Sequence, residues 1–314
     1  MKRVLVVYYS QTGQSGEVVR SFTAPLATCA DIELRLIALQ PRTPYPFPWR
    51  FFRFLDVFPE SVHLDPAPIV PIEVAPDEDY DLVILAYQVW FLSPSQPVTA
   101  FLKSRAAQRL LAGKPVVTLI ACRNMWLMAQ EKMKALLAAV GARLTDNVAL
   151  TDRGGLSTFV TTPRWLLTGR RDGFWGLPPA GLSDAQIAAC ARFGHALVAA
   201  LARDEERSGR PMLTGLRAAD AEVRLIASER IGHRSFLLWG RLLRAVGGPG
   251  SRQRVPVLAI YVVFLVCMIV TVVPLAIGVK ALLRPLLARR LAAQKAYFEQ
   301  PSGSSSERMS TIHG

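Results

Sequence analysis

The sequence predicts an α/β protein built on a doubly wound, five-stranded parallel sheet. Short apolar runs recur through residues 1–150, and stretches of helical character separate them. The first run begins at Val4, and the others cover 32–39, 82–86, 116–121 and 143–150. The expected helices cover 16–28, 98–111, 126–140 and 184–207, with Gly141 as a stop signal and Asp184 after Ser183 as a start.

The turn after the first run has the composition of an anion site. Its residues are Ser10, Gln11, Thr12, Gly13, Gln14 and Ser15. Hydroxyl donors and the exposed N–H groups of a helix start converge there, and Gly13 allows close approach or a positive φ. The turn holds no Lys or Arg, which suits a monophosphate held by neutral donors. It lacks the GxxxxGK[ST] of a nucleoside-triphosphate loop and the GxGxxG of a dinucleotide fold.

The pattern from Ser10 to Ser15 resembles the FMN-phosphate loop of flavodoxin-like proteins, which carry [ST]-x-T-G-x-[ST]. The resemblance implies FMN as the cofactor and a strand order of 2-1-3-4-5. In that order the cofactor lies against the loops that follow strands one, three and four.

Two of those loops carry flat and polar side chains. The candidate cofactor residues there are Tyr87, Gln88, Val89, Trp90, Phe91, Cys122, Arg123, Asn124 and Trp126. The aromatic rings could sandwich an isoalloxazine ring, while Gln88 and Asn124 could meet its pyrimidine edge. Alternatively, Trp90, Phe91 and Trp126 are core or lid aromatics.

Two irregular segments flank the expected site. Residues 41–76 include nine prolines among 36 residues, which precludes a long helix. This insertion is expected to be either a lid that admits a hydrophobic substrate or plain structural cover, with His63 as a solvated residue. Residues 151–180 are loop-rich and contain several arginines. Arg164, Arg170 and Arg171 could bind the phosphates of NAD(P), or they are surface charges or lipid-head contacts.

The charge and the cysteine content of the chain indicate which binding partners and which compartment to expect. The net charge of +13 indicates an anionic partner, and anionic lipid is favoured over nucleic acid because no nucleic-acid reader motif is present. The four cysteines are widely spaced, which fits a reduced compartment and excludes a disulfide frame or a zinc site. The opening residues lack a signal-peptide pattern, so residues 1–207, the FMN-binding domain, are expected in the cytoplasm.

Residues 255–279 form an uncharged run that predicts a membrane-inserting helix. Both flanks are basic, so the run is expected either to span the bilayer or to form a re-entrant or in-plane helix. The connector 208–254 is expected to contain a basic interfacial helix, since its arginines cluster on one side of a helical wheel. Those arginines are Arg230, Arg234, Arg241 and Arg244, and Gly232 and Gly240 weaken the helix prediction. The tail 280–314 is basic, with a Ser-rich end expected to be disordered.

Four stretches together resemble the flavodoxin-like family of dialkylresorcinol condensing enzymes. They are VLVVYYSQTGQ, the proline-aromatic insertion, ACRNMWLMAQEKM and TPRWLLTGRRDGFWG. The resemblance implies oxidative aromatisation of a dialkylcyclohexanedione to a dialkylresorcinol, beside a ketosynthase partner, in dialkylresorcinol and aryl-polyene lipid biosynthesis. Hydride would pass to flavin N5 while a base takes the neighbouring proton; the candidates are Tyr87, Arg123 and Asp152.

Two alternatives stay open. One is a membrane-associated, flavodoxin-like quinone or protoporphyrinogen oxidoreductase. The other is a non-enzymatic membrane scaffold with a degenerate flavodoxin fold. In each case the expected location is the cytoplasmic face of the inner (plasma) membrane.

Overall fold

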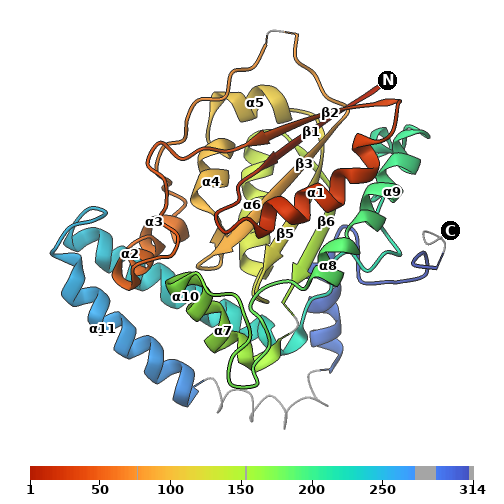
Figure 1. Ribbon diagram of the computed structural model, residues 1–314. Coiled ribbons are helices and arrows are strands. Elements are labelled where there is room, and N and C mark those ends of the chain that lie inside the picture. The colour runs from red at the N-terminus through yellow and green to blue at the C-terminus, as the bar shows by residue number, and fades with distance from the viewer. Residues whose placement is uncertain (76, 153, 273–287, 311–314) are drawn as a thin grey trace.

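A parallel β-sheet forms the centre of the protein, shown in Figure 1 as a computed structural model. The structure describes residues 1–75, 77–152, 154–272 and 288–310. The main strands are β1 (Lys2–Tyr8), β2 (Ile32–Ala38), β3 (Leu82–Trp90), β5 (Pro115–Cys122) and β6 (Arg143–Thr151). Each pairs with its neighbour in parallel. The predicted α/β fold with a parallel sheet is therefore confirmed.

The order of the strands differs from the prediction. The sheet has six strands in the order β2-β1-β3-β5-β6, with the two-residue strand β4 (Ser93–Pro94) paired antiparallel to the end of β3. The prediction was five strands in the order 2-1-3-4-5. The numbering changes because the chain folds back after Trp90 and adds β4, where the sequence indicated only an aromatic loop.

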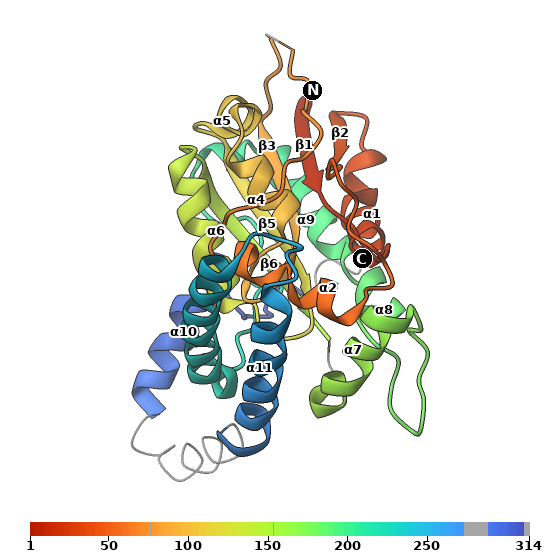
Figure 2. The same ribbon diagram turned by 90° about the vertical axis from the view of Figure 1, so that its left-hand side faces the viewer.

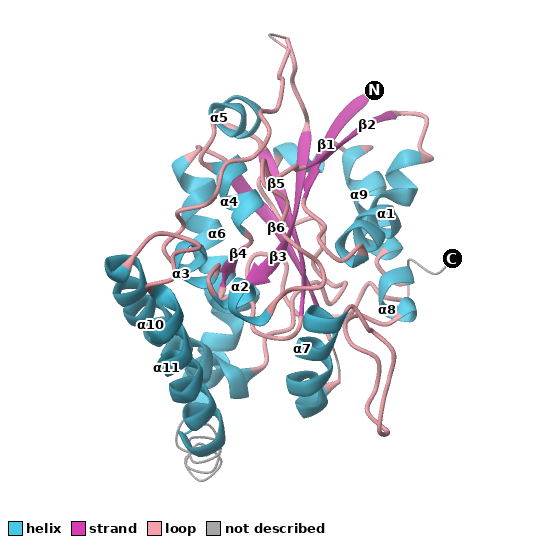
Figure 3. Ribbon diagram, turned by 60° about the vertical axis from the view of Figure 1, so that its left-hand side comes forward, coloured by secondary structure: helices cyan, strands magenta, loops and turns pink. Residues whose placement is uncertain are grey.

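Figure 3 shows helices on both faces of the sheet, and a hydrophobic core lies on each side of it. Helices α4 (Gln96–Leu102), α5 (Arg105–Leu111) and α6 (Leu127–Ala139) cover one face; α1 (Gln14–Ala27), α8 (Asp184–Ala188) and α9 (Ala191–Leu201) cover the other. Neighbouring residues of one strand belong to opposite cores, as Leu5 and Val6 of β1 do. Covering on both faces explains why the central strands β1, β3 and β5 carry long buried apolar runs, whereas the edge strands β2 and β6 include polar and charged residues.

Two predicted helices are interrupted. The expected helix 98–111 is divided between α4 and α5, because Ser104 caps a new helix by accepting the N–H of Ala107 at 3.2 Å. The expected helix 184–207 consists of α8, α9 and a 3₁₀ turn at Glu205–Arg207. Its start was predicted correctly, since Ser183 and Gln186 form a capping box.

The insertion between β2 and β3 forms two short helices, α2 (Phe51–Leu55) and α3 (Phe58–Val62). They pack against the long helix α10 (Val223–Val246) and against α11 (Arg254–Cys267) in a third, smaller core. His63, expected to be solvated, is half-buried, and its Nε2 lies 3.3 Å from the carbonyl oxygen of Leu237 in α10. On the opposite side of the insertion, a 3₁₀ turn (Gly155–Ser157) leads into α7 (Thr158–Thr168).

The glycines of α10 have a packing role that the sequence did not reveal. A Cβ on buried Gly240 would lie 3.0 Å from a Val62 side-chain carbon and 3.1 Å from the His63 ring. Glycine there lets α10 approach α3 closely. The predicted helix therefore forms across both glycines, and Arg244 at its end pairs with Asp65 at 2.6 Å.

Of the predicted membrane-inserting helix at 255–279, the structure describes residues 255–272, and they do not form a bilayer-spanning helix. Within the described residues, none of the helices combines the length and the hydrophobicity needed to cross a bilayer. Helix α11 is followed by a π-helical turn, η3 (Met268–Val272), and residues 273–279 of the predicted segment lie outside the described part. Figure 2 shows α10 and α11 side by side at one end of the molecule.

The C-terminal tail makes specific contacts where it is described. Residues 288–299 are helical, and Ser302, in the stretch expected to be disordered, is fully buried. The Ser302 hydroxyl donates to Asp146 Oδ1 at 2.8 Å and accepts from the N–H of Asn147, both in β6. The tail therefore completes the packing of the edge strand.

Candidate functional site

A pocket of about 190 Å³ lies at the carboxyl ends of β1, β3 and β5. Four groups of residues line it: the turn after β1, the ends of β3 and β5, segments from the insertion and α7, and the loop residues Asp152 and Gly181. The lining includes Thr12, Ser15, Trp49, Trp90, Phe91, Arg123, Asp152, Thr162 and Trp165. The site forms where the strand order reverses direction from β1, the usual ligand position in an open α/β sheet.

The turn after β1 is an open anion-binding element. Gly13 has φ +90°, a backbone conformation that favours glycine, and it precedes the first turn of α1. Ser10 Oγ accepts the N–H of Gly16 at 3.0 Å. Among the described residues, no acceptor contacts the backbone N–H groups of Gln14 and Ser15. Two donors at a helix start therefore remain available to a ligand.

A hydrogen bond joins this turn to the end of β3. Gln88 Nε2 donates to Ser15 Oγ at 3.0 Å, and Gln88 Oε1 accepts from the Trp90 indole at 3.3 Å. Gln14, by contrast, is buried and bonds to both backbone groups of Leu182. Gln14 therefore fixes the neighbouring loop, and Gln88 aligns the aromatic wall with the turn.

Aromatic side chains from three separate segments form the walls of the pocket. Trp49 of the insertion lies edge-on to Trp90 with ring centroids 6.1 Å apart, and Phe54 lies 5.0 Å from Phe91. Trp165 of α7 completes the set and contacts Phe47 of the insertion. The insertion therefore lines the pocket directly.

The β3–β4 turn is strained. Phe91 and Leu92 have φ of +49° and +57°, a region that bulky residues rarely adopt. The turn is nevertheless held firmly, because buried Ser93 accepts a hydrogen bond from Lys132 Nζ at 2.7 Å. The same Lys132 Nζ donates to the Val62 carbonyl at 2.8 Å. The anchored turn places Phe91 in the pocket wall.

Two oppositely charged residues face the pocket. The guanidinium of Arg123 stacks over the Phe159 ring at 4.1 Å, and burial lowers its pKa. Within the described residues Arg123 forms no hydrogen bond or ion pair at contact distance, although the charge of Asp152 acts against the effect of burial on its pKa. Asp152 accepts the N–H of Gly154 at 2.8 Å through Oδ1 and the N–H of Gly181 at 2.9 Å through Oδ2. Burial also raises the pKa of the Cys122 thiol, so Cys122 is a neutral part of the lining.

The structure brings most, but not all, predicted site residues together. The lining includes Gln11, Thr12, Gln14, Ser15, Gln88, Val89, Trp90, Phe91, Cys122, Arg123 and Asp152. Five predicted residues do not line it: Ser10, Gly13, Tyr87, Asn124 and Trp126. Ser10 and Gly13 shape the turn instead. Tyr87 and Trp126 belong to the core beneath the site, and the Tyr87 hydroxyl donates to Gln130 at 2.7 Å.

The arginines considered for NAD(P) lie elsewhere. Arg164 pairs with Asp172 at 3.0 Å, and Arg171 donates to carbonyls of Ala180 and Leu182. None of the three lines the pocket. Residues that the sequence did not single out do line it, including Thr162, Trp165 and Leu166 of α7. The sequence indicated only that the loop-rich stretch 151–180 lies near the expected site. It did not identify which side chains of that stretch line the pocket.

Comparisons with known proteins give structural likenesses alone. Neither a family model nor a curated relative matches the chain. A flavoprotein in complex with FMN from Lactobacillus acidophilus NCFM is 15% identical with a TM-score of 0.37, covering 47% of this chain and 92% of that one. A flavodoxin from the domain Archaea is 9% identical with a TM-score of 0.35, covering 65% and 99%. Oxidised flavodoxin 1 from Bacillus cereus is 14% identical with a TM-score of 0.32, covering 61% and 94%. At such scores, the function of this chain is inferred from its own site.

Proposed function

We propose that the protein is an FMN-dependent oxidoreductase that aromatises a dialkylcyclohexanedione to a dialkylresorcinol. The observation that carries the proposal is one pocket with an open anion turn at one end and flat aromatic walls beside it. A mononucleotide with a planar ring matches this arrangement, because it carries a phosphate at one end and an aromatic ring system at the other.

Uncommitted polar atoms at the pocket fit that cofactor. Thr162 Oγ1 and Trp49 Nε1 are buried, line the pocket and have no hydrogen-bond partner within the described residues. Buried polar atoms are normally paired, so these two indicate a polar ligand. Together with the N–H groups of Gln14 and Ser15, they offer neutral donors and a hydroxyl, as a flavin phosphate and ring edge require.

The residues of the chain would then have distinct tasks. Thr12, Ser15 and the turn backbone would hold the phosphate, and Trp49, Trp90 and Trp165 would confine the ring. Bound FMN would supply the two-electron acceptor that the side chains lack. The aromatic walls would also exclude water from the substrate.

Aromatisation removes two hydrogens from the cyclohexanedione ring, one as hydride and one as a proton. Bound FMN would supply the acceptor for the hydride and both of its electrons, and loss of the two hydrogens would give the ring the double bond that completes the resorcinol. Asp152 is the proposed proton acceptor, because it is the carboxylate on the pocket. The Arg123 cation would stabilise negative charge on a ring oxygen as the proton leaves. Tyr87 is excluded as the base by its burial and its bond to Gln130.

The test begins with the purified protein and added FMN, followed by visible spectroscopy. Anaerobic addition of a dialkylcyclohexanedione should bleach the flavin absorption and yield one resorcinol per flavin. Asp152→Asn should keep FMN binding and slow bleaching by about 10²–10⁴-fold. Bleaching by a quinol instead, without resorcinol, would favour the quinone oxidoreductase. Failure to bind FMN would overturn the proposal and favour the scaffold.

We further propose that the enzyme works at the cytoplasmic face of the inner membrane, beside a ketosynthase that supplies its alkylated substrate. The net charge of +13 supports an anionic surface as a partner. A substrate with two alkyl chains would itself partition into lipid. Co-purification of the ketosynthase with the membrane-bound protein tests the pairing.

A further inference from the structure

Helix α11 exposes a strip without a charged residue. Its most exposed large side chains are Val255, Ile260, Val263, Val266 and, in the following turn, Val270, each between 44% and 66% exposed. At 100° per residue they fall within an arc of about 140°. Such a set of apolar side chains on one helix face marks an interaction surface.

The opposite face of α11 is packed against the protein. Tyr261 stacks near Phe58 of α3 with centroids 4.8 Å apart, and Trp239 of α10 lies 5.4 Å from Tyr261. Leu258 is also buried in this core. Because α11 is covered along this side, lipid cannot surround it, and only the exposed strip can meet an apolar phase.

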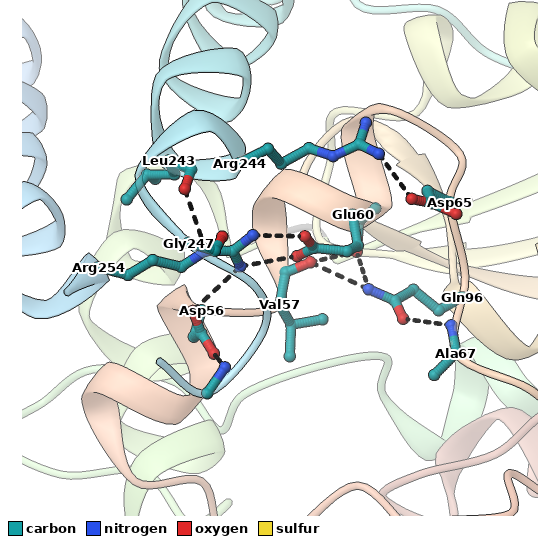
Figure 4. A network of polar contacts seen from close by, with 12 residues as sticks. Asp56, Val57, Glu60, Asp65, Ala67, Gln96, Leu243, Arg244, Gly247 and Arg254 are labelled. Atoms are coloured by element: carbon teal, nitrogen blue, oxygen red, sulfur yellow. Dashed lines mark hydrogen bonds and ion pairs between the residues drawn. The ribbon is translucent and has the colours of Figure 1, made fainter. Parts of the chain in front are cut away.

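A buried ion pair fixes the start of α11, as Figure 4 shows. Arg254 Nη2 lies 2.7 Å from Glu60 Oε1, and Arg254 Nη1 lies 3.1 Å from Glu60 Oε2. Asp56 is 3.3 Å from the same guanidinium, and the Gly247 carbonyl accepts from Nε at 2.7 Å. The helix is therefore attached to the insertion that lines the pocket, and the strip has a fixed orientation.

Basic residues lie beside the strip on α10. Arg234 and Arg241 are exposed, and within the described residues neither has an ion-pair partner. On the wheel of α10 they lie next to Leu238 and Leu242, which are also exposed. A basic row beside an apolar row is the arrangement of an interfacial helix at an anionic membrane.

We propose that the α10–α11 pair is a docking surface for an anionic bilayer and lies in the plane of its interface. The apolar strip of α11 enters the acyl boundary, and Arg234 and Arg241 contact lipid phosphates. This inference deepens the proposed membrane association and supplies its surface. It also gives the pocket a position near lipid, because Phe58 contacts Tyr261 of α11 on one side and Phe91 of the pocket wall at 5.7 Å on the other.

Vesicle flotation of the full chain tests the surface without any enzyme turnover. Vesicles of phosphatidylcholine with about one third phosphatidylglycerol should carry the protein upward, and pure phosphatidylcholine should carry much less. Val263→Asp with Val266→Asp should lower the partition coefficient by about tenfold or more, while Val263→Leu with Val266→Leu should retain it. Arg234→Glu with Arg241→Glu should lower it by a similar factor. The matched control is Arg20→Glu with Arg105→Glu, on α1 and α5, which makes the same change in net charge. This control should bind the anionic vesicles more strongly than the variant Arg234→Glu with Arg241→Glu.

Depth measurements test the orientation. Cys267 is exposed at the end of α11, so a fluorophore attached there reports the position of the strip, with Cys267→Ser as the unlabelled control. Nitroxides near the headgroups should quench it more than nitroxides at the bilayer centre. Stronger quenching at the centre would overturn the in-plane arrangement.

Three other results would overturn the docking surface. The first is absence of flotation, and the second is equal flotation of the aspartate variant with unchanged circular dichroism. The third is a dimer in light scattering that the aspartate variant dissociates, in which case a second copy covers the strip. FMN binding measured on the same variants separates these failures from failure of the proposed function, because none of the substituted residues lines the pocket.

Discussion

Two arginines show how differently the same side chain is used in two regions of this protein. Arg254, between α11 and the insertion, is buried and has two carboxylates and two carbonyls around its guanidinium. Arg123, at the pocket, is half-buried over an aromatic ring, and within the described residues it forms no ion pair at contact distance, although the charge of Asp152 acts on it from farther away. Burying a charge is costly unless it is paired. The paired arginine therefore serves the structure, and the unpaired one is available to a ligand.

Removal of the paired arginine should have the largest effect on stability. Arg254→Met would leave Glu60 and Asp56 without their cation, and we expect the free energy of unfolding to fall by about 3–5 kcal/mol. Urea unfolding followed by circular dichroism measures it. Pairing the change with Glu60→Leu should recover part of the loss. An unchanged unfolding midpoint in Arg254→Met would remove the distinction between the two arginines.

Removal of the unpaired arginine should affect function more than stability. Arg123→Met should change the free energy of unfolding by less than about 1 kcal/mol, because it breaks no ion pair. Turnover of the bound dione should fall by about ten- to hundredfold, since one charge-assisted hydrogen bond is lost. Stopped-flow bleaching of the flavin measures this, with Arg123→Lys as the charge-preserving control. A large loss of stability with normal turnover would contradict the assignment.

Glu229 of α10 is an intermediate case, with one carboxyl oxygen paired and the other not. It accepts the N–H of Met128 at 2.7 Å, its Oε2 has no partner in the described residues, and burial raises its pKa to about 8. Since the folded pKa exceeds the unfolded value, Glu229 contributes stability below about pH 4.5 that is lost as the pH rises towards 8. As the pH rises from about 4.5 to 8, the free energy of unfolding of the wild type should fall by about 2–4 kcal/mol more than that of Glu229→Gln.

Urea unfolding at several pH values checks this difference. The pKa of nearby His233 is lowered by burial to about 4, which gives stability that rises with pH below about 6.5. That contribution is present in both proteins and cancels in the comparison. Parallel pH curves for the wild type and Glu229→Gln would mean that the pKa of the Glu229 carboxyl is the same in the folded and unfolded states, which would contradict the raised value.

The smallest effect is expected at the anion turn. Gly13→Ala should cost about 1–2 kcal/mol because the alanine must take φ +90°, although a Cβ there would contact nothing within 4 Å. Gly16→Ala is the matched control, since its Cβ would make only ordinary contacts, the nearest at 3.6 Å to Ser10 Oγ. Thermal unfolding and FMN titration compare the two. Equal behaviour would show that the backbone conformation at Gly13 has no special role.

The local sequence predicted the elements whose physics is local. The apolar runs predicted the five main strands, because the central strands, covered on both faces, need apolar side chains at nearly every position. The edge strands β2 and β6 keep a shorter apolar pattern among polar residues. The turn from Ser10 to Ser15 was predicted as an anion site from hydroxyls, a glycine and a following helix, all within a few residues. The capping box at Ser183 was likewise readable, since its partners lie three residues apart.

Tertiary packing decided what depends on distant residues. The β3–β4 turn adopts left-handed Phe91 and Leu92 because Lys132 holds Ser93 from across the fold, which no local pattern announces. The 255–279 run was apolar enough to predict insertion, but only the structure shows that α11 buries one face against Phe58 and exposes the other. The hydrophobicity of the run predicts that its helix has apolar side chains to remove from water. The helices packed against it determine which face is buried in the protein and which face stays exposed.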